Sequence, residues 1–223
     1  MTPKRESVLS FHDSLLHQSD VDLLDGPYWL NDSIIGFYVE YLEKEVFADL
    51  NICFVRPEVT QCLKLSPQAE LPLFLDPLNF KTSELAVMPL NDCDNPTQVG
   101  GSHWSLLVYC KNADCFYHLD SSQGSNSSQA RDLAAKLSHY LRLKSDGTIH
   151  APNSPPEYVS LSSLQQNNSY DCGVFVLCNM DNVIKHFLRT GSLENLDYVR
   201  SQDVNRKRSD LKTLIMSLTE DAT

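Results

Sequence analysis

Residues 103–120, HWSLLVYCKNADCFYHLD, contain two apolar stretches separated by a short polar one, and this pattern constrains the fold more than any other part of the chain. Leucine, aromatic and β-branched residues cluster in both stretches, which is typical of strands. The polar pair Lys111-Asn112 between them is typical of a turn. We therefore predict strands near 103–110 and 114–120 that fold back on one another as a hairpin.

This hairpin brings a histidine and an aspartate together at its open end. With a two-residue turn, Cys110 pairs with Ala113, and His103 then lies opposite Asp120 with Cβ atoms about 4.5–5.5 Å apart. A longer turn shifts that register by a residue or two. A carboxylate beside an imidazole fixes its tautomer and stabilises the imidazolium, as in hydrolase triads. The pair is a candidate catalytic dyad, although a histidine at a strand start and an aspartate in a turn also fit simple structural roles.

A nucleophile for this dyad is found in the segment LQQNNSYDCGVFVLCNMDNVIKHF. Polar residues up to Asp171 give way abruptly to Cys172 and an apolar stretch of helical length, so Cys172 is expected in the first turn of a helix. The partial positive charge of a helix N-terminus and a nearby protonated histidine both stabilise a thiolate. The amides of the helix start and the side chain of Gln166 could hold an oxyanion, and Gly173 leaves room for a substrate backbone.

The remaining cysteines are expected to be unreactive. The chain has seven, an odd number, and no two of them form a C-x-x-C pair, so neither a disulfide framework nor a zinc site is indicated. Such usage is typical of a reducing compartment, where most cysteines are small buried hydrophobes. Cys178, further along the same predicted helix, fits that description. Cys172 differs by its glutamine-rich approach and the glycine after it, although burial alone would also fit it.

Other segments predict further helices and strands. Asn31 and Asp32 can cap a helix whose apolar residues recur at helical spacing up to residue 42. The remaining predictions are helices near 56–65, 127–143, 172–189 and 203–218, and strands near 52–55, 84–90 and 157–161. With 42% hydrophobic residues in 223, the whole of 1–223 is expected to form one domain.

The charge and the absence of apolar runs exclude several classes of protein. The formal net charge of −11 argues against nucleic acid as a partner and suits a basic protein partner. The only basic cluster, Arg206-Lys207-Arg208, is interpreted as a solvated helix face. No signal peptide or run of eighteen uncharged apolar residues is found. We expect a soluble intracellular protein with no membrane partner.

The polar segment 91–102, NDCDNPTQVGGS, lies directly before His103 and is interpreted as a mobile loop. Loops of this kind often carry ligand contacts, and Asn91 and Asp92 are candidates for such contacts. An exposed connection without a function fits the same pattern.

At this point the motifs become recognisable as a set. W-L-N-D at 29–32, H-W-S-L-L-V-Y at 103–109, D-S at 120–121 and Q-N-N-S-Y-D-C-G at 166–173 resemble the Ulp/sentrin-specific protease family of C48-type cysteine peptidases. The order His, Asp, Cys also separates the chain from papain-like enzymes, in which Cys precedes His. The resemblance covers nearly the whole chain and implies an α+β fold of the adenovirus-protease/Ulp type, a central mixed sheet flanked by helices.

The resemblance also implies roles for the residues that match. Cys172 is the nucleophile, His103 the general base and Asp120 its orienting partner; Gln166, favoured over Gln165 by its spacing to Cys172, is the oxyanion-hole side chain. The matching tryptophans in the family form a tunnel over the catalytic groove, so Trp29 and Trp104 are expected to admit a Gly-Gly tail and exclude bulkier residues. Asp32 is expected to hold a basic residue just upstream of that tail.

Within the family the chain most resembles the deneddylase branch, which acts on the ubiquitin-like modifier Nedd. The compact length and the start SFHDSLLHQSDVDLLDGPYWLND favour that branch. The expected activity is maturation of the Nedd precursor and its removal from proteins such as cullins, by a monomer in the cytoplasm or nucleus that needs no cofactor. Three alternatives stay open: the same chemistry on SUMO or ubiquitin, an acyltransferase with a similar triad, and a catalytically silent modifier-binding module.

Overall fold

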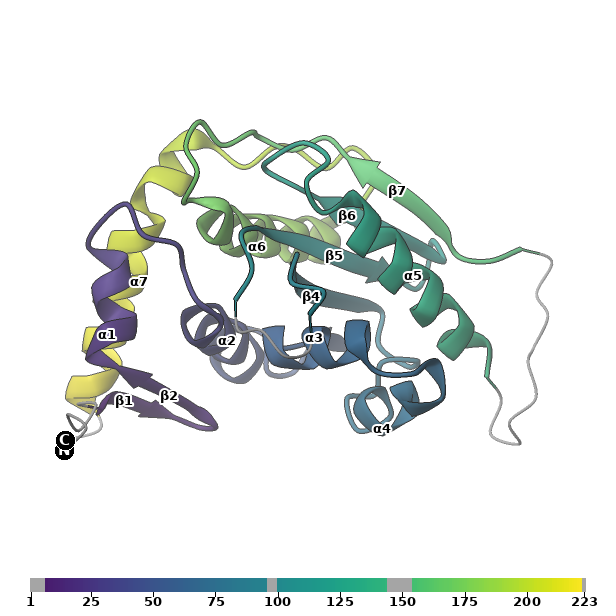
Figure 1. The fold of residues 1–223 in the computed structure, drawn as a ribbon, viewed down its shortest axis with the longest axis horizontal. Helices are drawn as coiled ribbons and strands as arrows, with labels where there is room; N and C mark the ends of the chain where they lie inside the picture. The colour runs from purple at the N-terminus through teal and green to yellow at the C-terminus, as the bar shows by residue number, and fades with distance from the viewer. Residues whose placement is uncertain (1–6, 96–99, 144–153, 222–223) are drawn as a thin grey trace.

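A five-stranded mixed sheet forms the centre of the computed structural model, which describes residues 7–95, 100–143 and 154–221 (Figure 1). The strand order is β3 (Ile52–Phe54), β4 (Leu85–Asn91), β5 (Trp104–Cys110), β6 (Cys115–Leu119) and β7 (Glu157–Leu161). The three middle strands are antiparallel, whereas β3 runs parallel to β4 and β7 runs parallel to β6. The predicted α+β class with a central mixed sheet is confirmed, and each predicted strand is present within one residue of its expected bounds.

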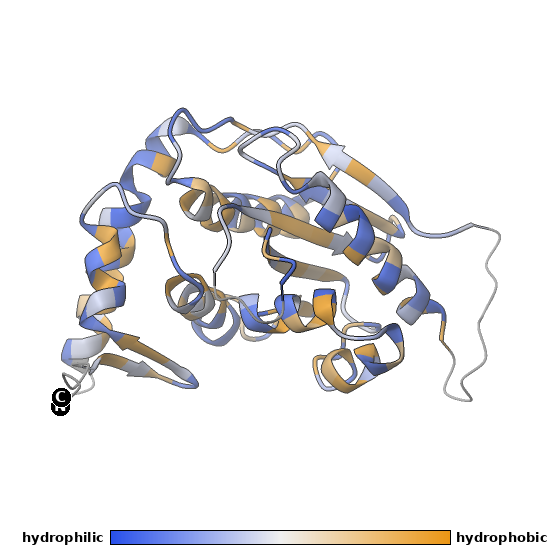
Figure 2. Cartoon of the chain, in the orientation of Figure 1, coloured by the Kyte–Doolittle hydropathy of each residue, from blue (hydrophilic) through white to orange (hydrophobic). Residues whose placement is uncertain are grey.

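Helices cover both faces of this sheet. Because side chains alternate along a strand, Leu106 and Val108 face one apolar cluster, while Leu107 and Tyr109 face the other. The first cluster is completed by α2 (Asp32–Tyr41) and α6 (Cys172–Thr190), and the second by α3 (Pro57–Leu65), α4 (Leu71–Leu75) and α5 (Ser127–Arg142). Figure 2 shows the apolar residues concentrated on the strands and on the helix surfaces that face them.

The turn between β5 and β6 is longer than the two-residue turn that we predicted. Cys110 pairs with Cys115, and Asp114 adopts a left-handed conformation with φ of 44°. The Tyr109 hydroxyl donates a hydrogen bond of 2.9 Å to the Asp114 carboxylate, which helps to hold this turn. The ladder ends at the pair Leu106–Leu119, so His103 and Asp120 are not directly opposite one another. The expected register is therefore wrong, and the longer turn moves it by two residues.

The N- and C-terminal parts of the described chain pack together at one end of the molecule, outside the sheet (Figure 1). There α7 (Ser201–Asp221) contacts β1 (Ser7–Phe11), which pairs with β2 (Ser14–His17) as a hairpin. It also contacts the 3₁₀ turn Asp22–Leu24, which follows the short α1 (Gln18–Val21). The sequence did not predict this hairpin because His12, at φ 46°, takes a left-handed turn position without glycine. No helix in the described ranges is long and apolar enough to cross a membrane.

The basic cluster on α7 is not the solvated face that we expected. Lys207 Nζ donates to the Tyr38 hydroxyl and to an Asp181 carboxylate oxygen, each at 2.7 Å. Arg208 bonds to Asp171 and is likewise mostly buried. Only Arg206 keeps more than half of its side chain exposed, at 56%. Two of the three cations therefore connect α7 to the rest of the molecule.

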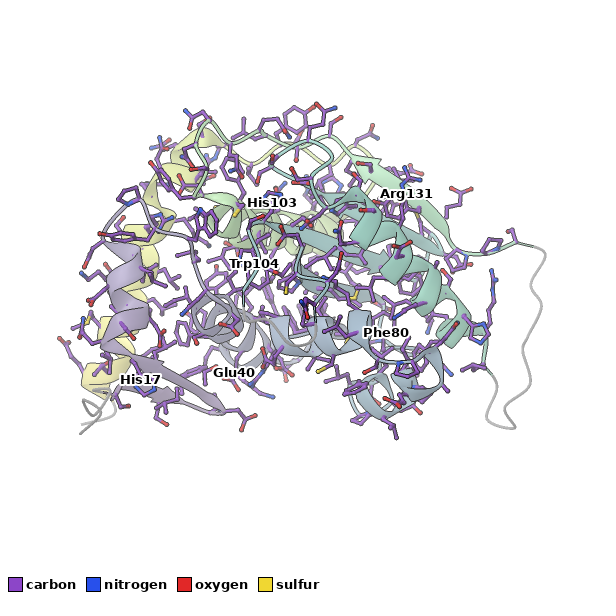
Figure 3. The ribbon with its side chains drawn as sticks, in the orientation of Figure 1. His17, Glu40, Phe80, His103, Trp104 and Arg131 are labelled. Carbon is purple, nitrogen blue, oxygen red and sulfur yellow. The ribbon has the colours of Figure 1, made fainter. Side chains whose placement is uncertain are left out.

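A buried ion pair fixes α2 against the N-terminal hairpin. Glu40 is fully buried near the end of α2 (Figure 3), and its carboxylate accepts hydrogen bonds from the amides of Asp13 and Ser14 at 3.1 and 2.9 Å. Arg56, just before α3, forms a salt bridge to the same carboxylate. The pair links the hairpin, α2 and the start of α3.

We expect Arg56→Met to lower the free energy of unfolding by about 3 kcal/mol or more, because it leaves a buried carboxylate without its cation. Urea denaturation measures this change. The control is Lys212→Met, since Lys212 and its partner Asp25 are both exposed and should contribute less than about 1 kcal/mol. An equal effect of the two substitutions would contradict the importance of the buried pair.

Candidate active site

Cys172 is the first residue of α6, as predicted. Its backbone follows Asp171, whose carbonyl accepts the first helical hydrogen bond, from the Phe175 amide at 2.9 Å. The Asp171 side chain occupies the N-cap position but does not bond to the amides of the first turn. Cys172 is 2% exposed and lies at the N-terminal end of the helix, where the partial positive charge of the helix dipole is located.

His103 lies directly before β5 (Figure 3) and interacts with both of its predicted partners. Its Nε2 is 2.6 Å from Asp120 Oδ1, and Cys172 is near enough to raise the pKa of His103. Since Asp120 uses Nε2, Nδ1 is the ring nitrogen left for Cys172. His103 and Asp120 are both buried. The structure therefore brings the three residues together in the order carboxylate, imidazole, thiol.

The surroundings favour the charged forms of His103 and Asp120. Burial acts to lower the pKa of His103, but its hydrogen bonds to Asp120 and Cys172 and the charges of these groups raise that pKa to about 9. Burial acts to raise the pKa of Asp120, but hydrogen bonds from His103 and from the amides of Asn126 and Ser122 lower it below its ordinary value. At neutral pH the pair is thus an imidazolium beside a carboxylate.

Asn126, at the start of α5, holds this pair in place. Its amide donates to Asp120 Oδ2 at 3.0 Å, and its side-chain Nδ2 donates to the His103 carbonyl at 3.5 Å and to Ser105 Oγ at 3.0 Å. Ser105 Oγ also lies 3.0 Å from His118 Nε2. Burial lowers the pKa of His118 to about 4, so this second histidine is neutral and does not compete for the charge of Asp120. Asn126 was not predicted as a site residue, because it lies in the turn-like run SSQGSNSS, where asparagine is an ordinary turn residue.

The two glutamines before Cys172 are held in different ways. Gln166 Oε1 accepts from Ser121 Oγ at 2.8 Å, which orients its amide, and its Nε2 donates to the Asn168 carbonyl at 2.6 Å. An amide NH₂ has two donors, so this bond uses one of them. Gln165 Nε2 instead donates to the carbonyls of Asp120 and Ser163, both at 3.0 Å. The bonding of Gln165 gives it a role in holding the backbone, which favours Gln166 as the functional amide.

A cavity of about 430 Å³ opens beside the thiol and is lined by both tryptophans, Asp32, Asn91 and Cys172. Trp29 is 47% exposed, and its Nε1 donates to the Ser169 carbonyl at 2.6 Å. Trp104 Nε1 donates to the Leu30 carbonyl at 3.1 Å. The polar edge of each ring is therefore fixed by backbone. The structure places the two predicted tunnel residues and the predicted nucleophile around one cavity.

Two carboxylates line this cavity. Asp32 is the first residue of α2, and Glu58 is in the first turn of α3. The Glu58 carboxylate lies one turn along α2 from Asp32, because a Cβ at Gly36 would be 3.7 Å from Glu58 Oε2. No local sequence pattern indicates Glu58, since its position depends on how α3 packs against α2.

The two ends of the segment 91–102 are hydrogen-bonded to one another next to the cavity. Residues 96–99 lie outside the described residues. Asp92 accepts hydrogen bonds from the amides of Ser102 and His103 at 2.7 and 3.1 Å. Burial acts to raise the pKa of Asp92, but these bonds and that of the Ser102 hydroxyl lower it. Asn91, Cys93 and residues 100–102 line the cavity, whereas Asp92 does not. Asp92 therefore joins the two ends of the loop and anchors the backbone of His103.

Gly173 has a different surrounding from the one expected. A Cβ at this position would lie 2.9 Å from Leu30 Cβ and 3.4 Å from Ile35 Cδ1. The space beside Gly173 is thus filled by the segment that leads into α2. The structure explains the glycine by the close approach of α6 to Leu30, not by room for a substrate.

The other buried cysteines lie in apolar surroundings that disfavour a thiolate. Burial raises the pKa of Cys53 and of Cys178 to about 12, and it also raises the pKa values of Cys110 and Cys115. No disulfide joins any of the seven cysteines. Among the described residues, no group of three or more His, Cys, Asp or Glu side chains is placed to hold a metal ion.

Comparisons with known sequences agree with the motifs. Residues 76–220 match the profile of the Ulp1 protease family, C-terminal catalytic domain. The chain is 40% identical to sentrin-specific protease 8 of Homo sapiens over 216 residues, which cover 96% of this chain and 98% of that protein. It is 34% identical to NEDD8-specific protease 1 of Arabidopsis thaliana, with 94% of this chain and 89% of that protein covered.

Comparison with solved structures supports the fold. The C-terminal Ulp1 protease domain in complex with Smt3, the yeast orthologue of SUMO, has a TM-score of 0.72 at 20% identity and covers 96% of this chain and 89% of that one. The Chaetomium thermophilum Ulp1-like SUMO protease catalytic domain has a TM-score of 0.56 at 20% identity, with 90% of this chain and 78% of that one covered. The expected Ulp-type fold is thereby confirmed.

The pKa of His103 predicts how its contribution to stability depends on pH. A folded-state pKa of about 9 lies above the ordinary value of about 6.5, so the stabilisation is complete below pH 6.5 and is lost as the pH rises through 9. We expect the difference in free energy of unfolding between wild type and His103→Asn to be larger at pH 6 than at pH 10. Urea denaturation at pH 6, 8 and 10 measures this, and a difference that stays constant would contradict the raised pKa.

Proposed function

The chain belongs to the Ulp1 protease family and is a cysteine protease of ubiquitin-like modifiers. We propose that it cleaves the bond after the C-terminal Gly-Gly of Nedd, the modifier written NEDD8 in the name of its Arabidopsis thaliana relative. The single observation that carries the proposal is the contact series Asp120, His103, Cys172 beside a cavity with two tryptophans. Preference for Nedd is supported by the near full-length similarity to NEDD8-specific protease 1.

The proposed reaction begins with the Cys172 thiolate, which attacks the carbonyl carbon of the terminal glycine. Because the pKa of His103 is about 9, this histidine already carries its proton at neutral pH and acts first as an acid toward the departing amine. The nitrogen takes this proton as its bond to the carbonyl carbon breaks, the amine leaves, and a thioester remains on Cys172. Neutral His103 then takes a proton from water, whose oxygen attacks the thioester carbonyl. The Cys172 thiolate leaves, the modifier is released with a C-terminal carboxyl group, and protonated His103 is restored.

The negative charge that develops on the carbonyl oxygen needs hydrogen-bond donors. We assign this role to the amides at the start of α6, which the Asp171 side chain leaves uncapped, and to the Gln166 amide that Ser121 orients. Asp120 keeps the imidazole ring in the orientation that presents Nδ1 to the sulfur.

Selection of the substrate would occur along the cavity. Trp29 and Trp104 border a space near the thiol that suits a chain segment without side chains, as a Gly-Gly tail is. Asp32 and Glu58 place two negative charges where a basic residue upstream of that tail could bind. Attack on an α-amide would mature a precursor, and attack on a lysine ε-amide would release Nedd from a conjugate such as a neddylated cullin.

We propose that residues 1–223 act as one catalytic domain. Trp29, Asp32 and Glu58 precede the family match at 76–220 yet line the same cavity as Cys172, so the N-terminal part contributes to the site. The cysteine usage fits a reducing compartment, and we place the activity in the cytoplasm or nucleus.

We expect Cys172-dependent turnover of C-terminal fluorogenic Nedd, with kcat/KM at least about tenfold above that for matched SUMO and ubiquitin substrates, which is a modest difference in transition-state binding. Cys172→Ala should retain modifier binding, measured by titration calorimetry, and lose turnover. Preference for another modifier would keep the chemistry and overturn the specificity. Residual turnover by Cys172→Ala would overturn the nucleophile, and a requirement for acyl-CoA would favour an acyltransferase.

Trp29→Ala and Asp32→Ala should each lower kcat/KM for a Gly-Gly-terminated substrate, by about tenfold for the loss of a buried contact. Trp29→Ala should also narrow the preference for Gly-Gly over a Gly-Ala tail, because a wider slot admits a side chain. The matched control is Tyr198→Ala, which removes an exposed aromatic ring away from this cavity. Unchanged turnover in both cavity variants would refute the assigned roles.

A further inference from the structure

Arg208, from the basic cluster on α7, reaches the residue that precedes the nucleophile. Its Nε and Nη2 donate to Asp171 Oδ1 at 3.0 and 2.8 Å. Its Nη1 donates to the Leu23 carbonyl at 2.8 Å, and Nη2 also donates to the Tyr28 carbonyl at 2.7 Å. Only 15% of the side chain is exposed. The planar guanidinium, with its several donors, is thus fixed on one side by backbone and binds the carboxylate on the other.

The Asp171 carboxylate is turned away from its own helix. An aspartate at an N-cap position ordinarily accepts a hydrogen bond from the amide two or three residues later. Asp171 makes no such bond. Its Oδ1 is held by Arg208, and its Oδ2 accepts from Asn168 Nδ2 at 2.8 Å. Both carboxylate oxygens are therefore engaged outside α6.

This arrangement matters for the amides that begin α6. If the carboxylate capped them, it would occupy the donors that a tetrahedral intermediate needs and would place a negative charge where the oxyanion forms. The guanidinium removes both effects, because it withdraws the carboxylate and balances its charge.

We propose that Arg208 is a positioning residue that holds the Asp171 carboxylate away from the start of α6 and so keeps its first amides available to the oxyanion. This inference rests on the proposed function, in which those amides stabilise the intermediate. It assigns a part of the catalytic arrangement to the C-terminal helix.

The test combines Arg208→Gln and Asp171→Ala, alone and together, with kcat and KM measured on the modifier substrate that the wild type cleaves fastest. Arg208→Gln should lower kcat by about 10- to 100-fold, which is no more than the lower part of the range of decreases in kcat caused by removing one oxyanion-hole donor. KM should change less than about threefold. In the Asp171→Ala background, Arg208→Gln should lower kcat less than about threefold, because no carboxylate remains to cap α6. If the two effects multiply instead, the inference is overturned.

Two controls separate this role from a loss of folding. Lys212→Gln removes another cation of α7, paired with exposed Asp25, and should leave kcat within about twofold. Urea midpoints identify any variant that is unfolded under assay conditions; if Arg208→Gln is unfolded, Arg208→Lys takes its place in the same four-variant comparison. Absence of Cys172-dependent turnover in the wild type would refute the proposed function, whereas an active wild type with Arg208→Gln equal to Lys212→Gln would refute this inference alone.

Discussion

The active-site end of this molecule depends on one buried carboxylate, that of Asp120. A charge removed from water is tolerated only when it is paired and hydrogen-bonded. Asp120 receives its donors from the imidazole of His103 and from the amides of Ser122 and Asn126. These groups come from the start of β5, the turn after β6 and the start of α5. Satisfying one charge therefore fixes three segments relative to one another, and with them the orientation of the imidazole toward Cys172.

Most of the regular elements could be predicted because their signals are local. The helix cap at Asn31, whose side chain accepts from the Ile34 amide at 3.1 Å, and the helix start at Cys172 are both visible as abrupt changes from polar to apolar residues. The proposed triad was accessible for a different reason, since its residues stand in motifs of fixed order. The geometry then supplied what motifs lack: a distance of 2.6 Å between His103 and Asp120 and the ring nitrogen that makes the contact.

What could not be predicted depends on contacts distant in sequence or on unmarked backbone conformation. Asp114 adopts a positive φ in the turn, a conformation that the sequence does not mark with a glycine. The predicted hairpin register was therefore wrong. Leu30 packs so closely against Gly173 that no side chain fits at that position. Glu58 lines the cavity only because α3 packs on α2. Arg208 looked like a surface charge because its partners lie more than thirty residues away.

Arg208 of α7 is hydrogen-bonded to the carbonyls of Leu23 and Tyr28 in the N-terminal part of the chain. These bonds bear on when the surroundings of Cys172 are completed during synthesis. A ribosome releases the N-terminal segments before α7. The contact between Arg208 and the Asp171 carboxylate cannot form before α7 has emerged. In a nascent chain the proposed setting of Cys172 is therefore incomplete until α7 has emerged and docked.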